Sequence, residues 1–401
     1  MINRYLTTKN PSICSGCGAC VARCPKKCLR LKTDQDGFYY PEMINRDACI
    51  DCELCSKVCP FENTISNEKT SHFYAAYSTD PNKINNSSSG GIFPEIANMV
   101  LADNGKVYGA YLDENHKLFH IGISDVLDLP KLLGSKYLQS DTRNTFQECK
   151  EDLQNSRLVL YTGTPCQIQG LKNYLGKEYA NLYTLDVICH GVPSPKMFEG
   201  YIDFLERKHK AKLVDICFRD KKRNKWSITL RYTMEFPNGK RRNFYLISKL
   251  SEYFVAFLGG HISRESCYRC PFSSLVRPGD ITMGDFWGYQ ATRPELRHDE
   301  GLSILLVNTE KGKELIRRCE QKGVVFNEID ENSVRQSENK NLYFPTKRPL
   351  SREMVYKELN SYGFDFISKK YFRKSQTWQF RLRNNLPREV VRILDLLRGR
   401  K

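Results

Sequence analysis

The sequence predicts a mixed α+β and α/β protein, in which a small cysteine-rich domain precedes a larger mixed α/β domain and a basic helical tail. Nine of the 16 cysteines lie within residues 14–59. Strand-like and helix-like segments alternate from about residue 72, as is typical of an α/β domain. This periodic pattern weakens after about residue 325. We therefore expect domains at residues 1–66, 72–325 and 326–401.

Length and composition exclude several protein classes. A chain of 401 residues is long enough for two or three domains, and 40% hydrophobic with 27% charged residues is the composition of a globular protein. No apolar run approaches the ~18 residues of a membrane-spanning helix. The first ten residues lack the apolar core of a secretory signal, which predicts a cytoplasmic location. Cysteines in that compartment serve metals or redox chemistry more often than disulfides.

The chain is basic, and the excess charge is concentrated at one end. There are 62 Lys and Arg against 46 Asp and Glu, a net charge of +16, of which residues 368–401 supply +9. Such a charge fits nucleic acid, an anionic membrane surface or an acidic partner. The aromatic and basic segment 221–226 favours nucleic acid, but no recognition module is legible, so we expect no nucleic-acid binding. Residues 387–397 predict an amphipathic helix, which lies on an anionic membrane surface, docks a partner or is solvated.

The first sixty residues hold two copies of the pattern C-x2-C-x2-C-x3-C-P, and their first cysteines are 35 residues apart. A cubane 4Fe-4S cluster takes three thiolates from one such loop, and in a duplicated bacterial-type ferredoxin the fourth comes from the other half. Two zinc sites are the alternative, but zinc sites use paired C-x2-C hooks. The pattern predicts a ferredoxin-like domain with two clusters, one held by Cys14, Cys17, Cys20 and Cys59 and the other by Cys24, Cys49, Cys52 and Cys55.

The local patterns predict individual elements along the rest of the chain. Hairpins are expected at residues 28–41, 106–123 and 228–247. Helices are expected at residues 92–102, 166–175, 197–209 and 310–319. Strands are expected at residues 157–161, 182–188, 213–218, 280–286 and 303–308.

Four further cysteines stand in unusual contexts. Cys166 and Cys189 each follow a predicted strand, and Cys267 and Cys270 form a C-x2-C pair in a loop. Ligands gather outside the carboxyl ends of strands in open α/β sheets, so the two turns are expected to converge. Cys166 also begins a predicted helix, where the dipole favours a thiolate. The four are a third iron–sulfur site, reactive thiols beside a redox cofactor, or buried structural cysteines, whereas we expect ordinary packing for Cys28, Cys149, Cys217 and Cys319.

The order and spacing of several motifs resemble the beta-subunit family of coenzyme F420 hydrogenases and dehydrogenases over about residues 12–325. Besides the N-terminal cysteine runs, they are residues 87–91 (SSSGG), 134–137 (GSKY), 163–167 (GTPCQ), 189–195 (CHGVPSP), 218–221 (FRDK), 267–270 (CYRC) and 279–288 (GDITMGDFWG). The resemblance implies an iron–sulfur flavoprotein with FAD in the α/β domain. A flavin accepts single electrons from clusters and exchanges a hydride with a substrate, so the two cofactors suit one another.

The same motifs supply the candidate site residues. We expect the cofactor to contact Ser88, Ser89, Gly90, Gly91, Ser135, Lys136, Tyr137, Thr164, Arg219 and Lys221. Glycines let backbone N–H groups approach phosphate or flavin oxygens, although the SSSGG run also fits a flexible linker. Lys136 is either a ligand of a phosphate or the flavin or a solvated lysine, and Arg219 and Lys221 either bind a phosphate or an acidic substrate or form a surface ion pair with Asp220. His190 is a candidate proton donor, or a histidine held by hydrogen bonds in a turn.

These expectations define two functions. The first is an enzyme that passes electrons between ferredoxin-type clusters, FAD and an organic substrate, with ferredoxin or a similar donor as its partner. The second is a non-catalytic subunit that relays electrons to a partner enzyme. No motif identifies a deazaflavin pocket or a site that activates hydrogen.

Overall fold

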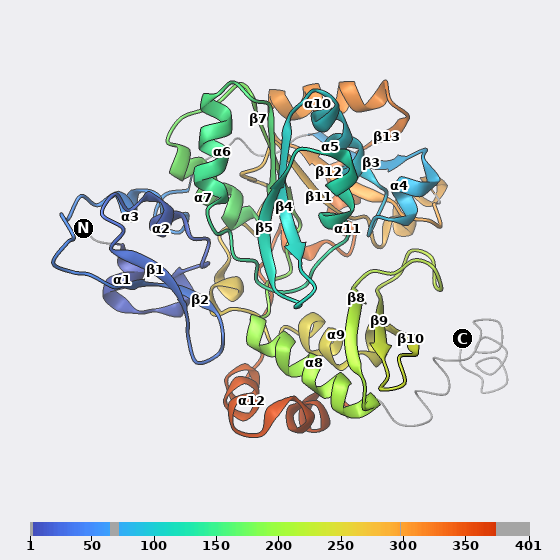
Figure 1. The fold of residues 1–401 in the computed structure, drawn as a ribbon. Helices are drawn as coiled ribbons and strands as arrows, with labels where there is room; N and C mark the ends of the chain where they lie inside the picture. The colour runs from blue at the N-terminus through green and yellow to red at the C-terminus, as the bar shows by residue number, and fades with distance from the viewer. Residues whose placement is uncertain (1–2, 65–71, 297, 374–401) are drawn as a thin grey trace.

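The computed structural model describes residues 3–64, 72–296 and 298–373 (Figure 1). Its N-terminal part is a small domain built around the two cysteine runs. The predicted hairpin pairs β1 and β2 antiparallel, and a short helix follows the first cysteines of each run. The elements are α1 (Arg4–Thr8), η1 (Pro11–Ile13), α2 (Ala19–Arg23), β1 (Leu29–Thr33), β2 (Tyr39–Met43) and α3 (Leu54–Lys57).

The centre of the molecule is an eight-stranded mixed sheet with the order β13-β3-β12-β11-β7-β6-β4-β5. Four neighbouring strands, β4, β6, β7 and β11, run parallel, and antiparallel strands extend the sheet on both sides. The strands are β3 (His72–Ser78), β4 (Lys106–Leu112), β5 (Leu118–Ile123), β6 (Val159–Gly163), β7 (Leu182–Val187), β11 (Ile281–Asp285), β12 (Ser303–Val307) and β13 (Val324–Ile329).

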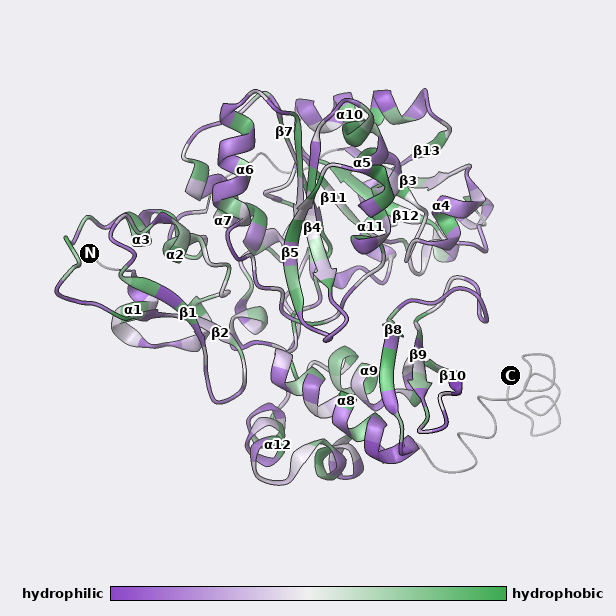
Figure 2. Ribbon diagram, viewed as in Figure 1, coloured by the Kyte–Doolittle hydropathy of each residue, from purple (hydrophilic) through white to green (hydrophobic). Residues whose placement is uncertain are grey.

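Helices cover both faces of this sheet, as the buried apolar strands require. Alternate residues of β6 point to opposite faces, so Leu160 packs under α5 (Ile92–Ala102) and α10 (Glu310–Glu320). Its neighbours Val159 and Tyr161 pack under α6 (Thr145–Gln154) and α7 (Pro165–Leu175), in a core that includes residues of the N-terminal domain. Figure 2 shows the hydrophobic strands enclosed by helices whose outer faces are hydrophilic.

A second layer of structure lies beyond the carboxyl end of the parallel strands (Figure 1). Three antiparallel strands, in the order β10-β9-β8, pack with three helices around a core rich in aromatic side chains. The elements are α8 (Pro195–His209), β8 (Lys212–Cys217), β9 (Thr229–Glu235), β10 (Arg241–Ile247), α9 (Glu252–Leu258) and α12 (Arg352–Ile367).

The structure corrects the expected boundary between residues 325 and 326. That boundary falls inside β13, which pairs with β3 and so belongs to the large sheet. The segment beyond it is also no separate tail as far as residue 373, because α12 packs into the core of α8 and α9. The expected helix at residues 387–397 and most of the basic tail lie outside the described residues.

Shorter elements connect these layers. They are α4 (Pro81–Asn85), η2 (Val126–Lys131), η3 (Ser248–Leu250), η4 (Glu265–Arg269), η5 (Tyr289–Ala291), η6 (Pro294–Leu296), α11 (Glu331–Gln336), η7 (Lys340–Leu342) and the π-helix η8 (Ser368–Phe372). A search of the described residues finds no helix both long enough and apolar enough to span a membrane.

Candidate functional site

A cavity of about 470 Å³ lies where the N-terminal domain, the large sheet and the second layer meet. Its wall includes the turns after β6 and β7, because the carboxyl ends of neighbouring parallel strands open on the same edge of the sheet. The SSSGG loop, residues 132–140 and the loop that carries η4 complete much of the wall, together with residues 15–17 of the N-terminal domain.

Four of the eight cysteines outside the two runs meet in this wall. Cys166 stands in the first turn of α7, Cys189 follows β7, and Cys267 and Cys270 lie in and after η4. Burial and, after it, neighbouring thiols of the group raise the pKa of Cys189 to about 12 and that of Cys270 to about 11. We call these residues the cavity cysteines.

The surroundings of the cavity cysteines suit thiolate ligands. The Gly191 N–H points at the Cys189 Sγ at 3.4 Å, and the Thr164 Oγ1 lies 3.2 Å from the Cys166 Sγ. Gly191 has a φ of +103°, and a Cβ there would come within 2.7 Å of the Ser263 Oγ. Four thiols and hydrogen-bond donors around one space are the donor set that an iron–sulfur cluster needs.

The cysteines of the first expected cluster lie close to one another. The pKa of Cys20 is raised by burial and then by Cys17, Cys14 and Cys59, its expected partners, ahead of Cys55. Backbone N–H groups of Gly16 and Cys28 point at the sulfurs of Cys14 and Cys24, at 3.4 and 3.3 Å. Nowhere in the described residues do three His, Cys, Asp or Glu side chains converge to hold a single metal ion. A cubane is larger than one ion, and its four thiolates stand on separate corners.

The first of these two groups adjoins the cavity. Cys17 forms part of the cavity wall, and Cys166 contributes to the raised pKa values of Cys14 and Cys17. Gly170 of α7 allows this close approach, because a Cβ there would lie only 2.9 Å from the Cys17 Sγ. We call Cys14, Cys17, Cys20 and Cys59 the proximal group, and Cys24, Cys49, Cys52 and Cys55 the distal group, in which Cys52 is exposed.

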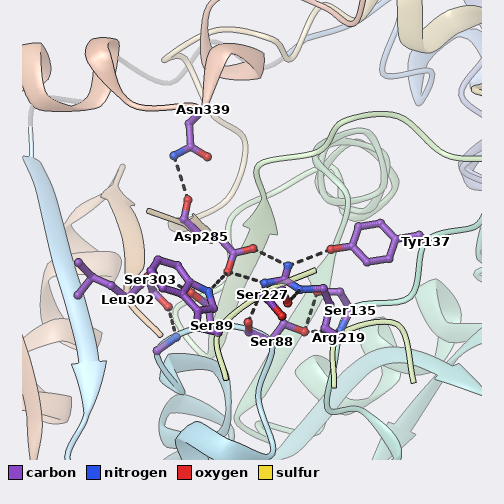
Figure 3. Close-up of polar contacts among 12 residues, drawn as sticks. Ser88, Ser89, Ser135, Tyr137, Arg219, Ser227, Asp285, Leu302, Ser303 and Asn339 are labelled. Carbon is purple, nitrogen blue, oxygen red and sulfur yellow. Dashed lines mark hydrogen bonds and ion pairs between the residues drawn. The ribbon is translucent and has the colours of Figure 1, made fainter. Parts of the chain in front are cut away.

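The SSSGG loop is held by hydrogen bonds to residue 135 and to residues 302 and 303 (Figure 3). The Ser135 N–H and Oγ donate to the Ser88 Oγ at 2.8 and 3.0 Å, and the Ser89 Oγ donates to the Leu302 carbonyl at 2.9 Å. The Gly90 N–H donates to the Ser303 Oγ at 3.0 Å. A Cβ on Gly90 would lie 2.5 Å from the Ala76 carbonyl oxygen, so the backbone of β3 excludes any larger residue there.

Two features of the loop suit an anionic group. The Ser87 Oγ is buried, lines the cavity and has no hydrogen-bond partner in the described part of the chain. The helix α5 begins after Gly91, whose φ is +81°, and no described side chain caps its first turn. Free N–H groups at a helix N-terminus together with a free hydroxyl are the donors that a phosphate accepts from.

Arg219 and Asp285 form a buried ion pair beside the loop (Figure 3). The Arg219 Nη1 and Nη2 donate to the two Asp285 oxygens at 2.6 and 3.0 Å, and further bonds reach the Tyr137 hydroxyl and the Ser88 carbonyl. Arg219 therefore does not form the surface ion pair with Asp220 that was considered from the sequence. Its guanidinium is also not free to bind a phosphate. The pair instead ties the SSSGG loop to Tyr137 and to the end of β11.

The two candidate lysines are also engaged by the protein. The Lys136 Nζ donates to the Leu132 and Leu133 carbonyls at 3.0 and 2.9 Å, and burial lowers its pKa to about 7. The Lys221 Nζ donates to three carbonyls, and burial lowers its pKa to about 8. Lys136 lies in the cavity wall, whereas Lys221 does not. These contacts replace the solvated lysine and the surface ion pair considered from the sequence.

The remaining candidates stand at the turns after the parallel strands. His190 lies in the wall, its pKa is lowered by burial, and its carbonyl accepts from the Thr346 Oγ1 at 2.9 Å. The Thr164 N–H donates to the Gln167 Oε1 at 3.0 Å and so begins α7. His120, not anticipated, also lines the cavity, and burial lowers its pKa to about 4.

Sequence reasoning missed the partners that organise the wall. Asp285 had no assigned role, yet it holds Arg219 and accepts from the Trp226 Nε1 at 2.8 Å, while the Trp226 ring stacks on Trp287 at 4.1 Å. In the segment 221–226, the side chains of Lys221 and Trp226 therefore form hydrogen bonds within the protein. Arg264 was also missed. The only feature of the sequence that points to Arg264 is its position three residues before the C-x2-C pair. Its importance follows from its complete burial, which the sequence does not reveal.

Comparisons with known proteins match two regions of the chain to known families. Residues 156–332 match the family model for the C terminus of the coenzyme F420 hydrogenase/dehydrogenase beta subunit, and residues 13–63 match the 4Fe-4S dicluster domain. The chain joins a beta-subunit domain of this family to a dicluster domain. The predicted resemblance and the mixed fold class are confirmed. The beta-subunit domain and the dicluster domain identify an iron–sulfur protein of the oxidoreductase class, related to hydrogenase and dehydrogenase subunits.

One solved structure is similar over most of the chain. It is a chain of the F420-reducing NiFe hydrogenase complex from Methanosarcina barkeri, with 15% sequence identity, 77% of this chain and 91% of that chain covered, and a TM-score of 0.43. The search of curated proteins finds no match to the sequence.

Proposed function

We propose that the protein is a ferredoxin-linked iron–sulfur flavoenzyme that passes electrons between its clusters, FAD and a small organic substrate. One observation carries the proposal: the cavity cysteines and the SSSGG loop line the same cavity, next to the proximal group of the dicluster domain. The distal group, with its exposed Cys52, would receive electrons from ferredoxin or a similar carrier. FAD would supply the conversion between single electrons and a hydride.

The chain's own residues would divide the remaining work. The cavity cysteines would hold a third 4Fe-4S cluster. Ser87, Ser88 and the first turn of α5 would bind the pyrophosphate of FAD, because they combine a free hydroxyl with unpaired N–H groups. The Arg219–Asp285 pair would hold this loop in place. His190 would move a proton at the substrate, since it lies in the wall and burial lowers the pKa of its imidazole.

Cofactor analysis of the anaerobically purified protein tests this proposal. We expect about twelve irons and one FAD per chain, because three cubanes carry four irons each. The Cys267→Ser/Cys270→Ser variant is the matched control and should retain about eight irons. About eight irons with FAD in the unmodified protein would make the cavity cysteines structural or catalytic. Eight irons and no flavin after reconstitution would overturn the flavoenzyme.

The alternative, a non-catalytic relay subunit, is separated by turnover. A flavoenzyme reduces or oxidises a small organic substrate with reduced ferredoxin as the only added protein. A relay subunit turns over only after its partner enzyme is added back.

A further inference from the structure

Arg264 lies between the proximal group and the cavity cysteines, and none of its side chain reaches solvent. Its N–H donates to the Val192 carbonyl at 3.0 Å, and its carbonyl accepts from the Cys267 N–H at 3.0 Å. The backbone of Arg264 therefore belongs to the loop that carries the cavity cysteines. Its guanidinium reaches the other way, into the dicluster domain.

The contacts of that guanidinium are unusual for a buried cation. The Nε donates to the Cys14 carbonyl at 2.7 Å, the Nη1 donates to the Gln139 Oε1 at 3.3 Å, and the group lies 3.8 Å from the Tyr40 ring centre. The Nη2 is buried and has no hydrogen-bond partner within the described residues. All of these partners are neutral.

Other buried arginines of the protein have a carboxylate. Arg219 pairs with Asp285, Arg277 with Asp186 and Arg352 with Asp36, whereas no ion pair among the described residues includes Arg264. A buried charge without a counter-ion is strongly destabilising, so a permanently charged guanidinium in such a place implies an anion nearby.

The groups that favour the charged form of Arg264 are Tyr40, the thiols of Cys14 and Cys267, and the exposed carboxylate of Asp34, so two of the four are thiols of the two cysteine groups. Its charge opposes the rise in the pKa of both Cys14 and Cys166, and Cys267 in turn favours the charged guanidinium. Cys14 belongs to the proximal group, and Cys166 and Cys267 belong to the cavity cysteines. A 4Fe-4S cluster with four thiolates carries a net charge of −2 when oxidised and one more negative charge when reduced.

We infer that Arg264 is the shared counter-charge of the proximal cluster and the cavity cluster and raises the reduction potentials of both. The part of this inference that concerns the cavity cluster rests on the proposed function, which includes that third cluster. With both clusters bound, one electron would pass from the reduced proximal cluster to the oxidised cavity cluster, and no bond or proton would move. A fixed cation stabilises the reduced state of a cluster more than its oxidised state, because the reduced state is more negative. Arg264 would therefore raise the reduction potentials of the clusters on both sides of it.

Redox titration of the full-length holoprotein, followed by electron paramagnetic resonance, tests the inference. In Arg264→Gln we expect the equilibrium constant for reduction of each cluster to fall roughly tenfold. This corresponds to a decrease of about 59 mV in each midpoint potential for one electron. Arg264→Lys keeps the charge and should remain near the unmodified protein. Arg318→Gln is the matched control, because it removes the same charge from α10, where Arg318 pairs with Asp103.

The outcomes separate this inference from the proposed function. Unchanged potentials in Arg264→Gln, with about twelve irons per chain, would overturn the counter-charge and leave the third cluster standing. A lowered proximal potential in a protein with about eight irons would support the role at the proximal cluster and overturn the bridge to the cavity. If Arg264→Gln binds no clusters, the Arg264→Lys variant decides between the outcomes. Near-normal potentials in Arg264→Lys would support the role of the positive charge, whereas loss of its clusters as well would overturn the inference.

Discussion

The dicluster domain and the cavity hold two kinds of cysteine group that the chain builds in different ways. In the proximal group three cysteines fall within residues 14–20, and the third of them lies in the short helix α2. The cavity cysteines come from positions between 166 and 270, and only Cys267 and Cys270 are near neighbours in sequence. A site made by one tight loop depends on local backbone, whereas a site made by several turns depends on the whole sheet.

The two regions also differ in exposure. Cys52 of the distal group is exposed. The cavity cysteines are partly shielded from solvent, and this burial is the largest cause of their raised pKa values. In the proposed enzyme, electrons would enter at the distal group and be used in the cavity, away from water. Arg264 and Gly170 lie where the two regions meet.

The largest effect should come from single cysteine changes that break one group at a time. We expect Cys189→Ser to lose about four irons and Cys52→Ser to lose a different set of about four, with distinct paramagnetic signals remaining. Iron analysis and electron paramagnetic resonance measure this. Cys149→Ser, a change in the core behind the sheet, is the control and should keep every cluster. Full iron content in Cys189→Ser would contradict the cavity cluster.

Breaking the ion pair beside the SSSGG loop should come next in size. We expect Arg219→Met to lower the free energy of unfolding by about 3–5 kcal/mol, because Asp285 is left buried and uncompensated. The double variant Arg219→Met/Asp285→Leu should recover most of that loss. Urea unfolding measures both. The dicluster irons should be unaffected, and equal losses in the single and double variants would refute the pairing argument.

The pH dependence of stability should reveal Lys136 on the cavity side. Its pKa falls from 10.5 to about 7 on folding, so between these values the unfolded state binds the proton and the folded state does not. Stability should then rise with pH above about 7, by up to about 1.4 kcal/mol per pH unit. Lys136→Met should flatten this slope. Lys131→Met, which alters a lysine paired with Asp128 outside the cavity, should leave it intact, and an unchanged slope in Lys136→Met would reject the assignment.

The smallest effect concerns the contact between the two regions. Ala is favoured over Gly inside a helix by about 1 kcal/mol, but a Cβ at position 170 would crowd the Cys17 Sγ at 2.9 Å. We expect Gly170→Ala to be destabilising by about 1–2 kcal/mol and to broaden the proximal cluster's signal while the distal signal stays sharp. Thermal unfolding and resonance spectra test this. A stabilised variant would mean that α7 and Cys17 are less closely packed.

Much of the fold could be predicted because it is written in local patterns. The hairpins at β1–β2, β4–β5 and β9–β10 and the helices α5, α7, α8 and α10 lie close to their expected ranges. Several elements had no expected range, among them α6, α9, α12 and β13. The position of β13, a short strand, depends on pairing with β3, which lies far away in sequence.

The sequence by itself determined the two dicluster loops, because three ligands and their turn lie within one short stretch of chain. It also indicated that the turns at Cys166 and Cys189 open on one edge, since parallel strands share their direction. Only the tertiary structure decided the roles of the charged groups: Arg219 met Asp285, Lys136 and Lys221 met carbonyls, and Arg264 met no carboxylate in the described chain. The physical reason is that the cost and partner of a charge depend on burial, which is set by residues distant in the chain.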